Sequence, residues 1–226
     1  MQRLIASINT AWWSLVKFGF RLLYNEFAFT YDIVSKVVSL GAWRCWQRSG
    51  LNHLPPPDAG VILELAHGTG DMQIDLKARG YKRVGYDLSR QMGRIAWRKL
   101  ARQGISPDLV RGDAQKLPFR TAQFPAVLST FPTNFILMET TLAEIHRVLK
   151  ADGLLVVVSN GALVSGGVLR SFLEWLYRIT GQREGQDSHA MAYLHELLDR
   201  HGFMLEVVYE HCPRSVATVL IIRKKV

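Results

Sequence analysis

The 226-residue chain is short of features that would assign it to a class at once. Its two cysteines, Cys45 and Cys212, are far apart and without metal-type spacing, so no cysteine-based metal site is expected. They are compatible with a reducing cytoplasm. Internal repeats and low-complexity tracts are missing too, which excludes a repeat array. The remaining composition, 48% hydrophobic and 21% charged, is that of a globular protein, and the length suits one domain.

Long hydrophobic runs are also missing. The longest uncharged stretch near the start, Leu4 to Val16, falls short of the roughly 20 residues that a membrane-spanning helix needs. With Arg3 before it, this stretch loosely resembles a signal peptide, but it lacks a small-x-small cleavage site and the apolar pattern continues past Lys17 and Arg21. The sequence therefore predicts a retained N-terminal segment.

Acidic residues are fewer than basic ones, 19 against 28, which leaves a formal net charge of +9. A basic balance of this size suits nucleic acid, an anionic membrane surface or an acidic ligand, and it is equally compatible with a solvated basic surface. Charge alone does not choose among these partners.

The chain divides into three zones. Residues 1–53 are aromatic-rich with helical patterns, and the proline-rich loop 54–60 ends that zone because proline cannot continue a helix. Then short apolar runs alternate with helical patterns, which predicts an α/β fold: a doubly wound, mostly parallel seven-stranded sheet. The expected strands are 61–66, 83–87, 108–111, 126–130 and 154–159, and the expected helices are 71–79, 89–103 and 138–149. A last zone, helix 189–200 with strands 203–209 and 216–223, predicts an antiparallel hairpin at the sheet edge.

The leading segment has a continuous apolar stripe at spacings of four and three. The stripe consists of Leu4, Ile8, Ala11, Leu15, Phe18 and Leu22. Trp12 and Trp13 widen the apolar arc, and Arg3, Lys17 and Arg21 share the narrow remaining face. Such a helix, residues 1–25, is typical of one lying on a membrane surface. The alternative is that it packs on its own domain or on a partner chain, since so wide an apolar arc is rarely left in water.

A glycine turn, Gly68-Thr69-Gly70, lies between the first expected strand and its helix. At this point of a doubly wound sheet a ligand approaches the backbone closely, and the N-terminus of the helix favours a negative group. Asp87 ends the second strand about twenty residues later, where a carboxylate accepts hydrogen bonds from both ribose hydroxyls. A helix cap is the alternative role for Asp87, but Ser89 serves it better. The sequence therefore predicts a nucleoside site.

A dinucleotide is disfavoured at this turn. There is no third glycine at the spacing that phosphate binding favours, and Asp71 stands where it would repel a pyrophosphate. A nucleoside that carries an amino acid suits the turn better, with Asp71 or Glu64 facing its ammonium group.

The combination of Glu64-x-x-x-Gly68-Thr69-Gly70, Asp87 and Arg111-Gly112-Asp113-Ala114 resembles the cofactor motifs of class I S-adenosylmethionine-dependent methyltransferases over residues 61–160. The resemblance implies a Rossmann-like fold in which the loop 64–70 holds the methionine part, Asp87 the ribose, and Asp113 with Ala114 the adenine edge. Asp113 also fits as a strand-end carboxylate that accepts from an exocyclic amine, and its alternative role is to cap a turn. His67 is expected to act as a cofactor-loop residue through its backbone and not as a base.

The cofactor-binding residues expected are Glu64, Ala66, His67, Gly68, Thr69, Gly70, Asp87, Leu88, Met92, Gly112, Asp113, Ala114, Ser129 and Thr130. No metal is expected.

A narrower resemblance is to the ubiquinone/menaquinone C-methyltransferase family. Residues 31–46 are similar to its N-terminal signature, residues 68–71 to its glycine loop, and residues 147–153 to its second signature. The departures are Ser35 for an expected Asn, Trp43 for an expected His, Ser159 near an expected Glu, and Pro125 where many methyltransferases have Asp. The cofactor half therefore matches more closely than the acceptor half.

The acceptor is expected at the end of the fourth strand, in the segment 129–135. There Asn134 would orient the substrate, and Tyr31 would close over the methionine end, as the resemblance implies, or belong to the core. His189 is a weak candidate for a base. An apolar, aromatic insert, residues 161–188, would cover the acceptor site as a lid near a bilayer, as a cover for a soluble apolar molecule, or as further core.

These features predict an S-adenosylmethionine-dependent methyltransferase that acts on a small lipophilic acceptor at a membrane surface, with quinone-type C-methylation favoured. The alternative is a phospholipid or other hydrophobic amine N-methyltransferase. An inactive, membrane-associated protein of the same fold is the alternative of another class, and Trp43 and Pro125 are its main support. Nucleic acid is not favoured as a partner, because a separate basic recognition domain is absent.

Two parts are expected: an N-terminal amphipathic helical extension or lid, residues 1–53, and a cofactor-binding methyltransferase domain, residues 54–226. The expected location is cytoplasmic, peripheral to the inner face of the membrane through residues 1–25.

Overall fold

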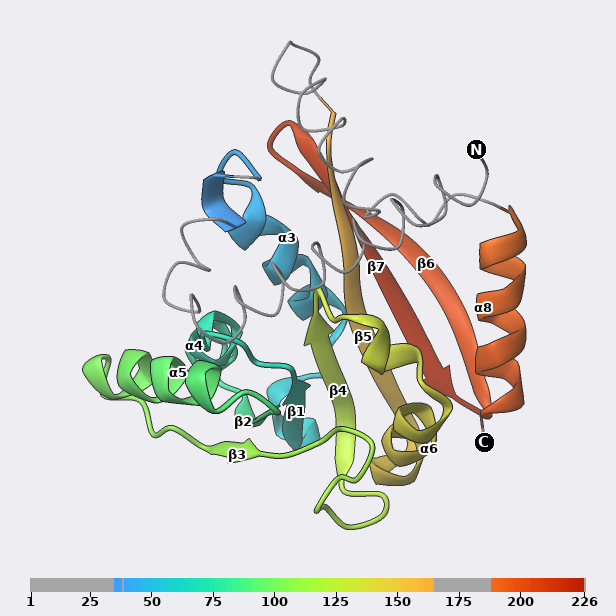
Figure 1. The fold of residues 1–226 in the computed structure, drawn as a ribbon, viewed down its shortest axis with the longest axis horizontal. Coiled ribbons are helices and arrows are strands. Elements are labelled where there is room, and N and C mark those ends of the chain that lie inside the picture. Colours follow the sequence, from blue (N-terminus) through green and yellow to red (C-terminus); the bar gives the residue numbers. More distant parts are fainter. Residues whose placement is uncertain (1–34, 38, 165–187, 226) are drawn as a thin grey trace, which may run out of the picture.

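The computed structural model describes residues 35–37, 39–164 and 188–225. These residues form one seven-stranded sheet in the order β3-β2-β1-β4-β5-β7-β6 (Figure 1). The strands are β1 (Val61–Leu65), β2 (Lys82–Asp87), β3 (Leu109–Arg111), β4 (Phe124–Thr130), β5 (Leu149–Leu163), β6 (Phe203–Cys212) and β7 (Ser215–Lys224). Strands β1 to β5 pair in parallel, and β7 runs antiparallel to β5 and to β6. The predicted doubly wound sheet with an edge hairpin is confirmed.

Helices follow the strands where the 3.6-residue pattern predicts them. They are α3 (Trp43–Ser49), α4 (Asp71–Ala78), α5 (Arg90–Arg102), α6 (Glu139–Val148) and α8 (Ser188–Arg200), with short 3-10 helices η2 (Gly50–His53), η3 (Pro57–Ala59) and η4 (Asn134–Leu137). Figure 1 shows α4 and α5 grouped near β1, β2 and β3, whereas α8 lies beside β6 at the other end of the sheet.

Two hydrophobic cores, one on each face, hold the sheet. Because side chains alternate along a strand, β1 sends Leu63 to one face and Ile62 to the other. Leu63 belongs to a cluster that includes Leu142 of α6. Ile62 belongs to a second cluster, which includes Trp46 of α3 and the buried residues Met72 and Leu76 of α4. Because both faces of the sheet are covered by hydrophobic residues of the helices, the central strands are continuous apolar runs in the sequence.

Strand β5 differs from its prediction. It runs from Leu149 to Leu163, whereas the apolar pattern predicted 154–159. Its early part pairs with β4 across a register shift between Phe124 and Ala126, and its late part pairs with β7 across another shift after Val158. The predicted insert therefore begins too early, because Gly161–Leu163 are paired strand. Residues 165–187 of that insert, and the leading segment with Tyr31, lie outside the described residues.

The two cysteines are joined. A disulfide links Cys45 of α3 to Cys212 at the end of β6, with the Cα atoms 6.0 Å apart. Their spacing of 167 residues carried no indication of this bond, and disulfides are rare in the reducing cytoplasm with which the two cysteines are compatible. The bond fastens α3 to the sheet.

Among the helices that the structure describes, none is long and apolar enough to cross a membrane.

Candidate functional site

The backbone of the turn after β1 has an unusual conformation. Ala66, Gly68 and Gly70 have φ values of 55°, 54° and 84°, a region that favours glycine. Open space surrounds the position where a side chain would begin at Gly68, whereas a Cβ at Gly70 would lie 2.8 Å from the Cβ of Ala96 in α5. Gly70 therefore allows α5 to approach the turn, and Gly68 leaves room for a ligand against the backbone.

Asp87 ties the ends of β1 and β2 together. Its Oδ2 accepts from the backbone N–H of Gly68 at 2.9 Å, and its Oδ1 accepts from the backbone N–H of Ser89 at 2.7 Å. The helix cap falls to Ser89, as expected, since its hydroxyl accepts from the N–H of Met92 at 3.3 Å. Each carboxylate oxygen can accept more than one hydrogen bond, so Asp87 retains capacity for ribose hydroxyls.

His67 is buried below the turn. Its ring nitrogen Nδ1 lies 2.9 Å from the carbonyl oxygen of Gly68, and burial lowers the pKa of the imidazole. A neutral ring with its proton on Nδ1 donates to that carbonyl. The ring fits because position 85 is glycine: a Cβ there would lie 3.0 Å from Cδ2 of His67. These contacts give the side chain a structural place in the loop.

Glu64 is a buried acid beneath the same turn. It is 1% exposed, and Nε2 of Gln73 in α4 lies 2.5 Å from its Oε2. Loss of water around the carboxylate raises the pKa of Glu64 to about 8, and the negative charges of Asp87 and Asp71 raise it further. The carboxyl is therefore protonated at neutral pH, and a cation brought close to it would favour ionisation.

We expect Glu64→Gln to flatten the pH dependence of stability. The pKa of Glu64 is about 8 in the folded chain against an ordinary 4.5, so between these values the unfolded chain has released a proton that the folded chain keeps. This group's contribution to the free energy of unfolding therefore falls as pH rises through that window. Relative to the unchanged protein, the variant should gain about 2 kcal/mol between about pH 6 and pH 8.

Denaturant unfolding at several pH values measures this difference. Glu206→Gln, at an exposed position of β6, is the matched control and should follow the unchanged protein. Parallel stability curves for Glu64→Gln and the unchanged protein would contradict the assignment.

Asp71 already faces two cations of its own chain. Its carboxylate lies 2.9 Å from Nζ of Lys99 in α5 and 3.8 Å from a guanidinium nitrogen of Arg44 in α3. Lys99 also donates to the hydroxyl of Thr69 at 3.2 Å. Asp71 thus braces the turn between two helices. Of the two acids proposed for an ammonium group, Glu64 is the one without an ion pair among the described residues.

Sequence reasoning did not single out the ion pairs that dock α3 on α4. Asp75 binds Arg44 and, at 3.0 Å, Arg48. A signal was present, because the two arginines and the two acids, Asp71 and Asp75, are each four residues apart and so share one helix face. The sequence alone does not show that α3 and α4 are neighbours, so it could not predict that these two charged faces contact each other.

The predicted adenine side lies at the ends of β2 and β3. Asp113 is exposed, and its Oδ1 accepts from the backbone N–H of Gln115 at 2.9 Å, so the alternative role of capping a turn is present in the structure. Gly112 is required there, since a Cβ would fall 1.9 Å from the hydroxyl oxygen of Tyr86. Leu88 is 64% exposed beside Asp87, whereas Met92 is buried. Leu88 is therefore the side chain available to cover a base.

The carboxyl end of β4 meets an aromatic cluster. The hydroxyl of the fully buried Ser129 donates to the carbonyl of Leu65 at 2.8 Å, which joins β4 to β1, and half-buried Thr130 follows it. Trp43 stacks on Phe131 with ring centroids 4.1 Å apart, and Trp46 packs 6.3 Å from the same ring. The half-buried rings of Trp43 and Phe131 form an apolar wall where the acceptor is expected, and buried Trp46 packs behind them.

The structure does not show the weak catalytic candidates Tyr31, Asn134 and His189 together, because only the side chain of Asn134 is described. Asn134 is exposed at the first position of η4. His189 lies in the first turn of α8, but its side chain is outside the described set, as is Tyr31. Among the described side chains, no cluster of three or more His, Cys, Asp or Glu residues could hold a metal ion.

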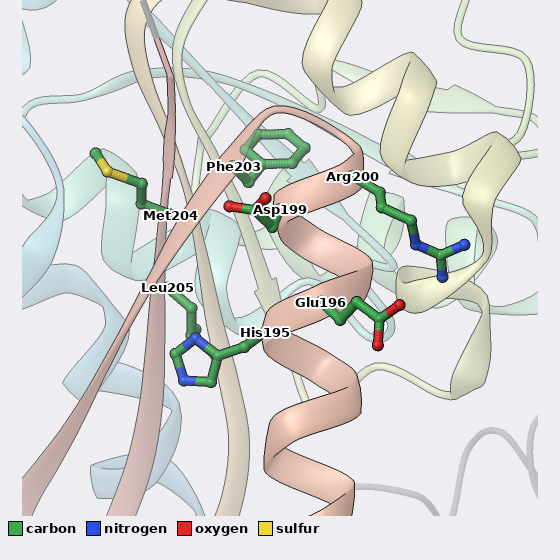
Figure 2. A pocket seen from close by; sticks show the side chains of 7 residues that line it. All are labelled: His195, Glu196, Asp199, Arg200, Phe203, Met204 and Leu205. Carbon is green, nitrogen blue, oxygen red and sulfur yellow. The ribbon is translucent and has the colours of Figure 1, made fainter.

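Another hollow lies away from this site. A cavity of about 440 Å³ between α8 and β6 is lined by His195, Glu196, Asp199 and Arg200 together with three apolar residues of β6 (Figure 2). Because β6 is at the opposite edge of the sheet from β3, this cavity is separate from the predicted cofactor turn.

Comparisons with known proteins agree with this geometry. The model of the ubiE/COQ5 methyltransferase family matches residues 19–204. A demethylmenaquinone methyltransferase of Thermotoga maritima is 30% identical over 88% of this chain and 93% of its own. A ubiquinone/menaquinone biosynthesis C-methyltransferase of Desulfotalea psychrophila is 33% identical over 78% and 73%. A demethylmenaquinone methyltransferase of Thermus thermophilus is 37% identical over 60% of this chain, and the match spans 63% of that relative's length.

Solved structures of low sequence identity share the fold. A SAM-dependent methyltransferase of Aquifex aeolicus is 14% identical, covers 78% of this chain and 88% of its own, and has a TM-score of 0.55. A phosphoethanolamine N-methyltransferase of Haemonchus contortus is 16% identical, covers 82% and 53%, and has a TM-score of 0.59. That structure was solved with phosphomonomethylethanolamine and S-adenosylhomocysteine.

Proposed function

The chain belongs to the ubiE/COQ5 methyltransferase family, and on that premise we propose that it methylates a ring carbon of a small, lipophilic, quinone-type acceptor. It is an S-adenosylmethionine-dependent methyltransferase with a Rossmann-like fold. The names of its relatives support a quinone-type substrate. The apolar wall of Trp43 and Phe131 at the end of β4 is the observation of this chain that supports a lipophilic substrate.

The residues of the turn fit the cofactor. Gly68 leaves open space against the backbone, Asp87 has acceptor capacity for two ribose hydroxyls, and exposed Leu88 can cover the adenine. The buried acid Glu64 lies beneath the turn, where a nearby ammonium group would restore its charge. S-Adenosylmethionine supplies an activated methyl group on a sulfonium, so the chain mainly has to position the two reactants.

Carbon methylation then places two demands on the protein. The acceptor ring must be electron-rich, which the reduced, hydroxyl-bearing form of a quinone provides, and its carbon must lie in line with the carbon–sulfur bond that breaks. The ring afterwards loses its proton. An apolar wall that stacks on a planar ring suits this positioning and excludes water. No side chain of the described residues is assigned as the base.

Replacing Trp43 by alanine should lower kcat/KM for the acceptor about tenfold, because the substitution removes the contact of one aromatic ring with the acceptor. The affinity for S-adenosylmethionine, measured by calorimetry, should stay within about twofold, since Trp43 belongs to the acceptor wall. Tyr193→Ala, at an exposed aromatic on α8, is the control and should change neither. Equal effects of the two substitutions on the acceptor would argue against the wall.

The activity itself is tested by supplying S-adenosylmethionine with a short-chain demethylmenaquinone, kept reduced or left oxidised, and locating the added methyl group by mass spectrometry and NMR. Methylation of the reduced form at carbon is the expected result. Methylation of phosphatidylethanolamine or another hydrophobic amine instead would favour the N-methyltransferase alternative. Cofactor binding without turnover of any acceptor would favour an inactive protein of this fold, for which Trp43 and buried Pro125 are the arguments.

Peripheral attachment to the inner face of the membrane through residues 1–25 is part of this proposal. It is supported by the apolar stripe and basic strip of that segment. Flotation with liposomes compares the full chain with one that lacks residues 1–25. If both float equally, the segment is not the attachment.

A further inference from the structure

Helix α5 presents a row of arginines that the cofactor site does not use. Arg90, Arg94, Arg98 and Arg102 recur at every fourth position of α5, which contains no acidic residue. At about 100° per residue the four span an arc of about 120°, so they lie on one side of the helix. Trp97 borders this arc, about 20° from Arg90, and is 55% exposed. We call these five residues the α5 face.

The positive charge of the α5 face is not neutralised within the part of the chain that the structure describes, where the four arginines have no ion pair. Lys99 points to the other side of α5 and is paired with Asp71. The opposite face of the helix is held by buried Met92, Ala96 and Leu100. The helix is therefore anchored by its apolar side, and the charged side is free to meet a partner.

A groove continues the α5 face toward the edge of the sheet. It has a volume of about 480 Å³, with Arg90, Arg94, Trp97 and Arg98 on one side and Leu109, Val110 and Arg111 of β3 on the other. Nε of Arg111 donates to the carbonyl of exposed Leu88 at 3.1 Å, which places another guanidinium beside an apolar side chain. The groove reaches Asp87 and Ser89, so it adjoins the predicted cofactor turn.

This combination fits a lipid surface. Guanidinium groups bind phosphate oxygens in pairs, and tryptophan is favoured at the level of lipid headgroups because its ring is apolar with one polar N–H. The α5 face forms a straight helical ridge about 20 Å long on one side of the groove, and a straight ridge suits a plane of headgroups. The net charge of the whole chain is also positive, which likewise favours an anionic surface.

We propose that the α5 face, with Arg111, docks on anionic phospholipid headgroups. Docking there would hold the cofactor turn next to the bilayer, in addition to any attachment through residues 1–25. The inference depends on the charge and exposure of α5 and not on the identity of the methyl acceptor.

The test measures partitioning of the full chain onto vesicles of phosphatidylcholine alone and of phosphatidylcholine mixed with phosphatidylglycerol. The variant carries Arg94→Gln and Arg98→Gln. Each arginine near an anionic surface strengthens partitioning about fivefold, so the variant should bind the mixed vesicles about 25-fold more weakly. Its binding to the neutral vesicles should not change, which separates the α5 face from the apolar leading segment.

The control carries Lys77→Gln and Lys82→Gln, which remove the same charge from exposed positions of α4 and β2. It should lose less than about threefold, because charges away from the docked face are screened beyond about 10 Å. Thermal melting and calorimetry of S-adenosylmethionine binding check that both variants are intact. An equal loss in the control would mean that only net charge matters, and an undiminished preference for mixed vesicles in the arginine variant would overturn the proposal.

RNA binding provides the competing outcome. If the protein bound single-stranded RNA with a steep dependence on salt, lost that binding in the arginine variant, and showed no preference for anionic vesicles, the α5 face would be a nucleic-acid surface and the proposal would be wrong.

Discussion

Replacing Asp87 by alanine should weaken the binding of S-adenosylmethionine by two orders of magnitude or more. Asp87 accepts from the backbone N–H groups of Gly68 and Ser89 at 2.9 and 2.7 Å, so its removal loosens the turn between β1 and β2. The proposed bonds to the ribose hydroxyls would be lost as well. Hydrogen bonds to a charged group contribute about 1.5–3 kcal/mol each, so the loss of two of them, about 3–6 kcal/mol, corresponds to a factor of about a hundred to tens of thousands.

The two roles of Asp87 can be separated by a double-mutant cycle. Calorimetry would compare S-adenosylhomocysteine with its 2′-deoxy analogue, on the unchanged protein and on Asp87→Ala. If Asp87 holds the ribose, the unchanged protein should prefer the full ribose about tenfold or more, and the variant should have lost most of that preference. A role confined to the turn would instead weaken both ligands equally.

Asp108→Ala is the control for Asp87→Ala. Asp108 is an exposed acid that precedes β3, and its carboxylate lies 3.6 Å from a guanidinium nitrogen of Arg83. Arg83 is buried but keeps its hydrogen bonds to the carbonyls of Gln73 and Ser106 when Asp108 is removed, so cofactor affinity should change by less than about twofold. Unchanged affinity in Asp87→Ala would exclude Asp87 from the site.

The fold was largely predictable because its signals are local. The apolar run 61–66 and the helical pattern 71–79 are properties of consecutive residues, and the structure places β1 and α4 within one residue of them. Ser89 was predictable as a cap for the same reason, since a cap bonds a residue three positions away. The length of β5 was not, because its last residues are held by β7, more than fifty residues later.

The chemistry of the site depends on distant residues in the same way. A sequence cannot show that Glu64 is closed off by α4 and thereby keeps its proton, because burial depends on how the helix is seated. Nor can it show that Asp71 is already paired, since Arg44 and Lys99 come from helices on either side of it in the sequence. The position of an acid in a motif was predictable, whereas its charge and its partners required the tertiary structure.

The disulfide is the clearest case of such a distant contact, and its removal should have a large effect on stability. The bond between Cys45 and Cys212 restricts an unfolded chain across 167 residues. Chain-entropy arguments for a closed loop of that length give about 5 kcal/mol, so we expect Cys45→Ser with Cys212→Ser to lower the free energy of unfolding by about 4–5 kcal/mol. For a chain of this size the melting temperature would fall by about 10 °C.

The fold itself should persist without the bond, because α3 has other attachments to the β6–β7 hairpin. Nε1 of Trp46 donates to the hydroxyl of Ser215 at 3.0 Å, and Nε2 of His53 in η2 lies 2.8 Å from a carboxylate oxygen of Glu210. The circular dichroism of the variant should therefore match that of the unchanged protein at low temperature, and only the transition should move.

Reduction provides the internal control. A reductant should lower the melting temperature of the unchanged protein to that of the double variant and leave the variant unaffected, and thiol labelling should count two free cysteines only after reduction. Because disulfides are rare in a reducing cytoplasm, the same labelling in intact cells also tests the location that cysteine usage suggested. Two free thiols in the cell, with a melting temperature equal to that of the variant, would mean that the cysteines are neighbours there without being bonded, and that Trp46 and His53 keep α3 and η2 on the β6–β7 hairpin without the disulfide.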